Sequence, residues 1–179
     1  MESLVLRRQN VSTWVRVLGI LLFATLTALS ARVSVPLPFS PVPLTLQVLV
    51  VVLSGFILGA RGGLLAQGLY LQAILFGAPL TALGLAGPAA FLSPTAGYLI
   101  AFPLAAWLAG KLSERVAGVY GRALGGLAAL VAIYALGAAW LSGFVGGISQ
   151  AWRLGVAPFA GADALKVLLA VAALSVRKR

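Results

Sequence analysis

The chain has 179 residues, of which 61% are hydrophobic and 9% are charged, and it carries a formal net charge of +10. Soluble domains contain about 45–50% apolar and about 25% charged residues, so this composition excludes a soluble globular domain and indicates an integral membrane protein. The chain has no histidine or cysteine and only three acidic residues, which excludes a zinc site of the usual kind, a thiol nucleophile and an imidazole base. We therefore expect no enzyme activity, no metal and no cofactor.

Six segments are long and apolar enough to be predicted as transmembrane helices, since a spanning helix needs about 20 apolar residues. In chain order they cover approximately residues 14–31, 44–60, 64–76, 95–112, 122–147 and 159–176. Proline-rich residues 33–43 predict a structured loop, Arg61-Gly62-Gly63 predicts a break, and residues 77–94 carry too many glycines and prolines to span. The sequence thus predicts an all-α protein with six transmembrane helices, forming a single membrane-embedded domain over residues 1–179.

The basic residues are distributed unequally between the two sides that six crossings define. With the N-terminus in the cytoplasm, ten of the 13 basic residues fall in cytoplasmic segments: Arg7, Arg8, Arg16, Arg61, Lys111, Arg115, Arg122, Arg177, Lys178 and Arg179. The other three, Arg32, Arg153 and Lys166, fall outside. Because basic residues concentrate in cytoplasmic loops, we expect both termini in the cytoplasm, and the positive charge does not indicate a nucleic-acid partner. A cleavable signal peptide is the competing interpretation of the N-terminus.

Asp163 and Lys166 are the most prominent polar residues of the predicted helices. They lie three positions apart at the outer end of the last helix, so they share one face. An ionisable side chain in hydrocarbon costs about 2.5–3.5 kcal/mol on insertion scales, so it marks a candidate functional site. One interpretation is a mutual ion pair. The other is a bound ligand that offers N–H donors to the carboxylate and an acceptor to the ammonium group.

Other polar residues lie at the outer ends of neighbouring helices. Thr45 and Gln47 begin the second helix, and Thr95 and Tyr98 share a face at the start of the fourth. Each could contact a ligand, but Thr45 could instead cap its helix, Gln47 could bond to backbone, and Tyr98 could anchor the chain at the membrane interface. Because all three outer segments contribute polar residues, we expect a ligand site that faces outward.

Three further polar residues, Gln67, Tyr70 and Arg32, could either contact a ligand or have a structural role. Gln67 and Tyr70 share a face of the third helix, where packing in the interior is the favoured role for Gln67. Arg32, at the outer end of the first helix, could contact an anion or extend to the membrane surface.

Small residues on the first helix predict a close helix contact. Ala24 and Ala28 are four positions apart, a spacing that lets two helices approach closely, either within the protein or with a membrane partner. The chain has no G-x-x-x-x-G-K-[ST] motif, so it cannot bind ATP in a P-loop. Energy for uphill transport would therefore have to come from a partner.

Four stretches, in order along the chain, together resemble the BioY family, the biotin-binding membrane subunits (S components) of energy-coupling factor (ECF) vitamin transporters. Pro41-Val42-Pro43-Leu44-Thr45-Leu46-Gln47 is similar to the family's P-V-P-x-T-x-Q. Gly59-Ala60-Arg61-Gly62-Gly63 resembles its turn into the third helix, and Ser93-Pro94-Thr95-Ala96-Gly97-Tyr98 resembles its G-P-T-G-G-Y. Ala160-Gly161-Ala162-Asp163-Ala164-Leu165-Lys166 resembles its P-G-D-x-x-K.

The resemblance implies a prokaryotic inner-membrane protein with six helices that binds biotin near the outer face. It implies that Asp163 and Lys166 contact biotin, and by motif position that Thr45, Gln47 and Tyr98 do so too. It also implies partners: a transmembrane coupling subunit, which Ala24 and Ala28 would contact, and two ATPase subunits. Biotin would be the transported ligand and not a cofactor.

Two other functions stay open from the sequence. The first is an S component of the same architecture for a different small vitamin-like ligand. The second is a membrane assembly protein without a ligand, in which Asp163 and Lys166 form only an ion pair.

Overall fold

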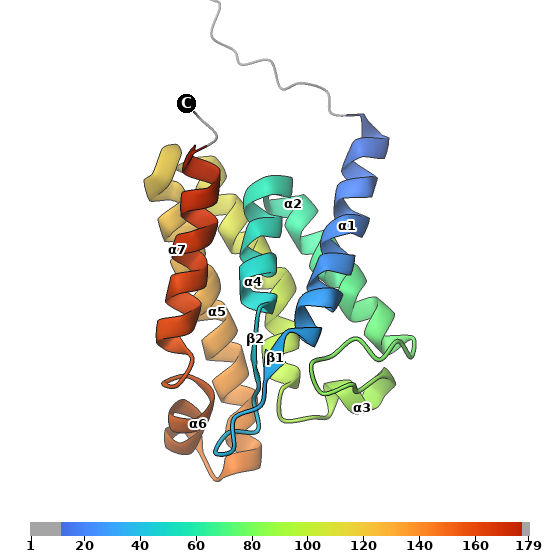
Figure 1. The fold of residues 1–179 in the computed structure, drawn as a ribbon, viewed down its shortest axis with the longest axis vertical. Coiled ribbons are helices and arrows are strands. Elements are labelled where there is room, and N and C mark those ends of the chain that lie inside the picture. The colour runs from blue at the N-terminus through green and yellow to red at the C-terminus, as the bar shows by residue number, and fades with distance from the viewer. Residues whose placement is uncertain (1–11, 177–179) are drawn as a thin grey trace, which may run out of the picture.

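The computed structural model describes residues 12–176, and its fold is a bundle of helices (Figure 1). The basic residues Arg7, Arg8, Arg177, Lys178 and Arg179 lie outside the described residues. The elements in chain order are α1 (Thr13–Arg32), β1 (Ser34–Val35), β2 (Leu44–Thr45), α2 (Gln47–Leu75), α3 (Gly87–Phe91), α4 (Ala96–Arg115), α5 (Gly118–Val145), α6 (Ile148–Gly155) and α7 (Ala160–Val176).

The lengths and composition of these helices identify a multi-pass membrane protein, as predicted. Among residues 12–176, four helices, α1, α2, α4 and α5, are long and apolar enough to cross a membrane. A fifth candidate span is the pair formed by α6 and α7, which is bent by 56° at the break between them. The helical fold is thus confirmed, with four or five candidate spans.

The helices predicted over residues 44–60 and 64–76 are the two arms of α2, which bends sharply at Gly59. Gly59 has φ 75° and ψ 177°, a left-handed conformation that glycine adopts without the penalty of a Cβ atom. The side-chain amide nitrogen of Gln47 in the first arm donates to the Tyr70 hydroxyl in the second at 2.8 Å. A straight helix would separate two residues 23 positions apart by about 35 Å, so the two arms run antiparallel.

The break in α2 lies at Gly59 and not at Arg61-Gly62-Gly63, so that expectation was wrong. Gly62 and Gly63 are helical and buried. A Cβ atom on Gly63 would lie 2.8 Å from the Cα atom of Gly55 in the facing arm. These glycines therefore serve close packing of the two arms, which sequence alone does not distinguish from a break.

The interior of the bundle lies around α4, which packs between α2 and α5 (Figure 1). Ala101, Ala105, Ala106 and Ala109 of α4 are all fully buried. Small residues at these positions let the backbones of neighbouring helices approach closely, which replaces the hydrophobic driving force that lipid does not supply.

Four short elements, β1, β2, α3 and α6, lie between the long helices at one end of the bundle (Figure 1). β1 and β2 pair antiparallel, with Ser34 opposite Thr45 and Val35 opposite Leu44, so the loop predicted over residues 33–43 is a β-hairpin. The helices α3 and α6 were not predicted, because each is shorter than a span. We call this end of the bundle the cleft end. The described chain begins and finishes at the opposite end, near Thr13 and Val176, which we call the terminal end (Figure 1).

Candidate functional site

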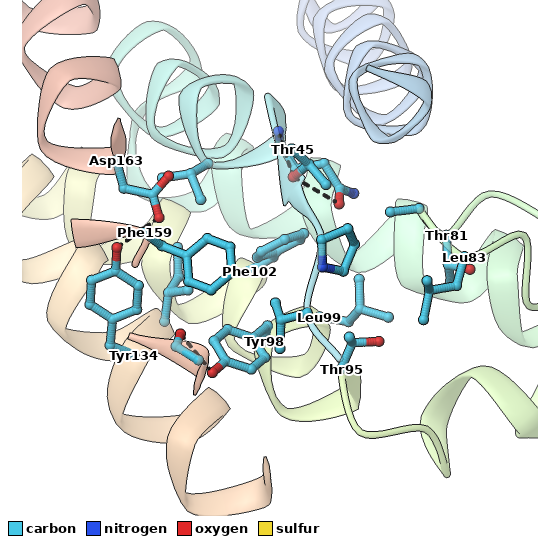
Figure 2. Close-up of a pocket in the computed structure, with 17 residues that line it drawn as sticks. Thr45, Thr81, Leu83, Thr95, Tyr98, Leu99, Phe102, Tyr134, Phe159 and Asp163 are labelled. Atoms are coloured by element: carbon cyan, nitrogen blue, oxygen red, sulfur yellow. Dashed lines mark hydrogen bonds between the residues drawn. The ribbon is translucent and has the colours of Figure 1, made fainter. Parts of the chain in front are cut away.

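A cleft of about 610 Å³, including the open space at its mouth, lies near the cleft end between α4, α5, α7 and the β-hairpin. Figure 2 shows the side chains that line it. The polar lining residues are Thr45, Gln47, Thr81, Thr95, Tyr98, Tyr134 and Asp163. The larger apolar ones are Val42, Pro43, Val48, Leu83, Leu99, Phe102, Ile133 and Phe159. A mainly apolar cleft with a few polar groups is typical of a small-molecule site.

Asp163 is the buried charge of this cleft. It lies in the first turn of α7, where its backbone N–H donates to the Phe159 carbonyl at 2.8 Å, and a carboxylate is favoured near a helix N-terminus. One carboxylate oxygen lies 2.6 Å from the Lys166 ammonium nitrogen. The other accepts a hydrogen bond from the Tyr134 hydroxyl at 2.7 Å. The ion pair therefore exists, while Asp163 also faces the cleft.

Lys166 does not line the cleft. Its ammonium group donates to the Asp163 carboxylate and also to the Thr45 carbonyl of β2, each at 2.6 Å. Both ionic side chains are almost fully buried, with 4% of Asp163 and 8% of Lys166 exposed. Two opposite charges at this distance offset each other's desolvation cost.

Thr45 and Gln47 both line the cleft, and they also bond to each other. The Thr45 hydroxyl accepts from the Gln47 backbone N–H at 3.2 Å, which satisfies one free donor at the start of α2. Tyr70 lies outside the cleft lining and is buried, where its hydroxyl accepts from the Gln47 amide and donates to the Leu80 carbonyl at 3.1 Å. Tyr70 thus holds the Gln47 side-chain amide in place through this hydrogen bond.

Tyr98 and Thr95 line the cleft from the start of α4. The Tyr98 hydroxyl donates to the Gly155 carbonyl of α6 at 2.9 Å, which holds α6 against the cleft. The Thr95 and Ser93 hydroxyls lie 3.1 Å apart. Both predicted residues are therefore in the cleft, and each hydroxyl has a protein partner.

The remaining predicted residues lie away from the cleft. The Arg32 guanidinium donates to the Pro79 carbonyl and so links the end of α1 to the loop after α2. Ala24 and Ala28 are each 8% exposed and face the bundle. Gln67 is fully buried between Thr27 and Ser54, in agreement with a packing role.

Sequence reasoning missed Tyr134 and Thr81, which also line the cleft. Tyr134 lies in the middle of α5 and reaches Asp163 across 29 positions in sequence. Its only signal was a hydroxyl group in the apolar middle of the helix. Thr81 lies in a loop, where its hydroxyl accepts from the Leu85 backbone N–H at 2.7 Å, and no periodicity marks it.

The chemistry available in the cleft is binding rather than reaction. The polar groups supply a carboxylate, hydroxyl groups and one amide, and the walls supply apolar and aromatic surface. Among residues 12–176, no three His, Cys, Asp or Glu side chains come together in a way that could hold a metal ion. The cleft therefore suits a small ligand that has N–H donors and a substantial apolar part.

Comparison with known proteins shows which family and fold the chain resembles. The model of the BioY family matches residues 7–179. A "Probable biotin transporter BioY" from Pyrococcus horikoshii is 42% identical over 150 residues, which cover 84% of this chain and 88% of that protein. A "Biotin transporter BioY" from Thermotoga maritima is 37% identical over 158 residues, which cover 88% and 92%. The crystal structure of an S-component for biotin from an ECF-type ABC transporter has the same fold, with a TM-score of 0.83 at 24% identity and with 93% and 92% of the two chains covered.

Proposed function

The chain belongs to the BioY family, and we propose that it is the biotin-binding membrane subunit of an ECF transporter. In this proposal the protein captures biotin at the cleft end, on the outer face of a prokaryotic cell membrane, and delivers it inward. ATP hydrolysis on partner subunits supplies the energy. Membership of this family also makes the protein a transporter component and not an enzyme.

The chemistry of biotin fits the lining of the cleft. Biotin has a ureido group with two N–H donors and one carbonyl, an apolar thioether ring and a carboxylate on an aliphatic chain. Asp163 and the hydroxyl oxygen of Tyr134 offer acceptors, and Phe102 and Phe159 offer apolar surface to the rings and chain. The observation that carries the proposal is the buried Asp163 side chain that lines the cleft, because acidic residues inside membrane segments mark functional sites.

The predicted contacts divide into two groups. We propose that Asp163, Thr45, Gln47, Thr95 and Tyr98 contact biotin, because all five line the cleft. Lys166, Tyr70 and Arg32 lie outside the cleft lining, and their contact with biotin stays a prediction.

The proposed topology has six crossings and both termini in the cytoplasm. The two antiparallel arms of α2 then count as two crossings, together with α1, α4, α5 and α7. Arg61 lies beside the Gly59 bend, and Arg115 and Arg122 lie at the junction of α4 and α5, at the terminal end. Their position supports a cytoplasmic terminal end, since arginine and lysine are concentrated on that side.

The proposed partners are a transmembrane coupling subunit and two ATPase subunits. The absence of a P-loop in the sequence supports the need for separate ATPases. Contact of the coupling subunit with Ala24 and Ala28 stays a prediction. Because both side chains face the bundle, a partner would reach them only if α1 moved.

The proposal is tested by equilibrium binding of labelled biotin to the purified wild-type protein and to Asp163→Asn. We expect the substitution to weaken binding at least about tenfold, the effect of losing one charge-assisted hydrogen bond. Glu114→Gln is the matched control, because Glu114 lies at the terminal end and caps the second arm of α2 through the Ala60 N–H. A well-folded wild-type protein that binds no biotin would contradict the proposed ligand.

The energy source is tested separately by biotin uptake in cells. We expect uptake to fall to background when the ATPase partners are deleted, while the purified protein still binds biotin. Uptake at the full rate without the ATPases would show that energisation by a partner is wrong.

A further inference from the structure

The Tyr98 ring lines the cleft and rests against two neighbouring helices. Its side chain is only 8% exposed, and its hydroxyl donates to the Gly155 carbonyl of α6 at 2.9 Å (Figure 2). The residues that face this ring from α5 and α6 are glycines, Gly137 and Gly155, and both are buried. The ring therefore lies where two helices carry no side chain.

Neither glycine has room for a side chain beside the ring. A Cβ atom on Gly137 would lie 2.6 Å from the Cζ atom of Tyr98 and closer still to two other ring carbon atoms. A Cβ atom on Gly155 would overlap the Tyr98 hydroxyl oxygen and lie 2.6 Å from a methyl carbon of Leu141. Real Cβ atoms essentially never come within 3.0 Å of such neighbours, so alanine at either position would displace the ring.

The surroundings of Tyr98 decide the direction of that displacement. The backbone of α4 already touches α5 beside the ring, because a Cβ atom on Gly97 would lie 2.6 Å from the Leu136 carbonyl oxygen and 3.1 Å from the Cγ atom of Trp140. Packed helices leave few spaces that a displaced ring can enter. The open space that Tyr98 borders is the cleft itself, so the ring would move toward the ligand.

We propose that Gly137 and Gly155 are positioning residues that set the width of the cleft, because they let the Tyr98 ring lie back against α5 and α6. Gly137 lies one turn of α5 from Tyr134, which also lines the cleft. One face of α5 thus supplies both a polar group and the space for the neighbouring ring. The inference rests on the proposed function, since it concerns the space that biotin would fill.

A purely structural role of these glycines predicts a different pattern of effects. Glycines that serve only helix packing would, when replaced by alanine, affect ligands of different size equally. Glycines that set the width of the cleft would affect a bulky ligand more than a slim one. Their effect would also depend on the presence of the Tyr98 ring.

The first test compares the affinities for biotin and for dethiobiotin, which lacks the sulfur atom and so has one ring instead of two. We expect Gly137→Ala to weaken biotin binding by the purified, folded protein at least about tenfold, the usual effect of overpacking, and dethiobiotin binding by a smaller factor. Gly155→Ala is expected to act in the same direction, and it replaces Gly137→Ala if that variant does not fold.

Gly143→Ala is the matched control for both variants. Gly143 lies in the same helix as Gly137, and a Cβ atom there meets no atom within 4 Å, so we expect both affinities to stay at the wild-type values. An unchanged biotin affinity in the folded Gly137→Ala variant, or an equal loss for the two ligands, would overturn the proposal.

The second test asks whether the effect passes through Tyr98. In a Tyr98→Leu background we expect Gly137→Ala to change the biotin affinity by less than about twofold, because residues that act through a contact are not additive. In a Tyr98→Phe background the loss from Gly155→Ala should shrink and the loss from Gly137→Ala should remain, since only the Gly155 Cβ atom would overlap the hydroxyl. Equal losses in every background contradict the role assigned to the glycines.

A readout without ligand separates this inference from the proposed function. The chain has four tyrosines, so protein labelled with 3-fluorotyrosine gives few fluorine resonances, and Tyr98→Phe identifies that of Tyr98. We expect Gly137→Ala to shift this resonance and Gly143→Ala to leave it in place. If the wild type binds neither ligand, the proposed function fails, while the resonance still reports the position of the ring. A Tyr98 resonance that Gly137→Ala does not shift would overturn the inference.

Discussion

The Tyr134 hydroxyl donates a hydrogen bond to the buried carboxylate of Asp163. The phenol oxygen lies 2.7 Å from Asp163 and lines the cleft, so its loss removes one of the two donors that hold the carboxylate. A buried group left without a partner costs about 1–3 kcal/mol. We expect Tyr134→Phe to weaken biotin binding about tenfold, since 1.4 kcal/mol corresponds to a factor of ten. Isothermal titration with purified protein measures this change.

A second tyrosine of α5 provides the control. Tyr120 is 81% exposed, so Tyr120→Phe is expected to leave the affinity unchanged. Equal affinities for the two variants and the wild type would show that the Tyr134 hydroxyl has no role in binding.

Gln67 carries a buried side-chain amide, and we expect its removal to change the stability of the protein only slightly. Its nitrogen donates to Thr27 and Ser54 at 3.1 Å each, but both hydroxyls already donate to backbone carbonyls of their own helices. The amide oxygen of Gln67 is buried without a partner among the described residues. We expect Gln67→Met to change the free energy of unfolding by less than about 1 kcal/mol, because it removes this unpaired acceptor and leaves no donor unpaired. Thermal unfolding in detergent checks this, and a large destabilisation would mean that the amide itself holds α1 to α2.

At the scale of elements, the bend of α2 depends on Gly59. A Cβ atom there would lie 2.4 Å from a carboxylate oxygen of Glu114, and the backbone angles of Gly59 (φ 75°, ψ 177°) lie in a region essentially restricted to glycine, which costs other residues about 1–3 kcal/mol. We expect Gly59→Ala to destabilise the protein by about 2 kcal/mol or more, since Glu114 must also leave the Ala60 N–H that it caps. Chemical or thermal unfolding in detergent measures the loss.

Gly68 in the second arm of α2 is the matched control. A Cβ atom at Gly68 meets no atom within 4 Å, and Gly68 lies within the helix, so Gly68→Ala is expected to be neutral or stabilising by about 0.5–1 kcal/mol. If both substitutions had the same effect, the bend would not depend on the conformation of Gly59.

For the whole molecule, the main prediction concerns orientation in the membrane. Because the chain has no cysteine, single cysteines report the exposure of chosen sites. Phe39→Cys lies in the loop of the β-hairpin at the cleft end, and Val119→Cys lies in the first turn of α5 at the terminal end, with both native side chains at least half exposed. We expect a membrane-impermeant maleimide to label Phe39→Cys in intact cells, and Val119→Cys only after the membrane is opened. The opposite pattern would invert the proposed topology.

The sequence by itself determined the class of the molecule and most of its helices. Composition required a membrane protein, since so few charged residues cannot cover a soluble surface. Runs of apolar residues predicted α1, α4, α5 and α7 to within a few residues, because span length is set by bilayer thickness. Asp163 was identified by the energetic cost of a carboxylate in an apolar helix, which does not depend on its neighbours.

Only the tertiary structure decided where the bend in α2 lies and which polar residues meet. Gly59 and Gly63 are the same residue type, and only the facing chain shows that one makes the turn and the other a packing contact. Tyr134 and Thr45 approach the Asp163–Lys166 pair from positions 29 and 121 residues away in sequence. Contacts over such distances depend on how whole helices pack, which no local pattern encodes, and this packing places Asp163 toward the cleft.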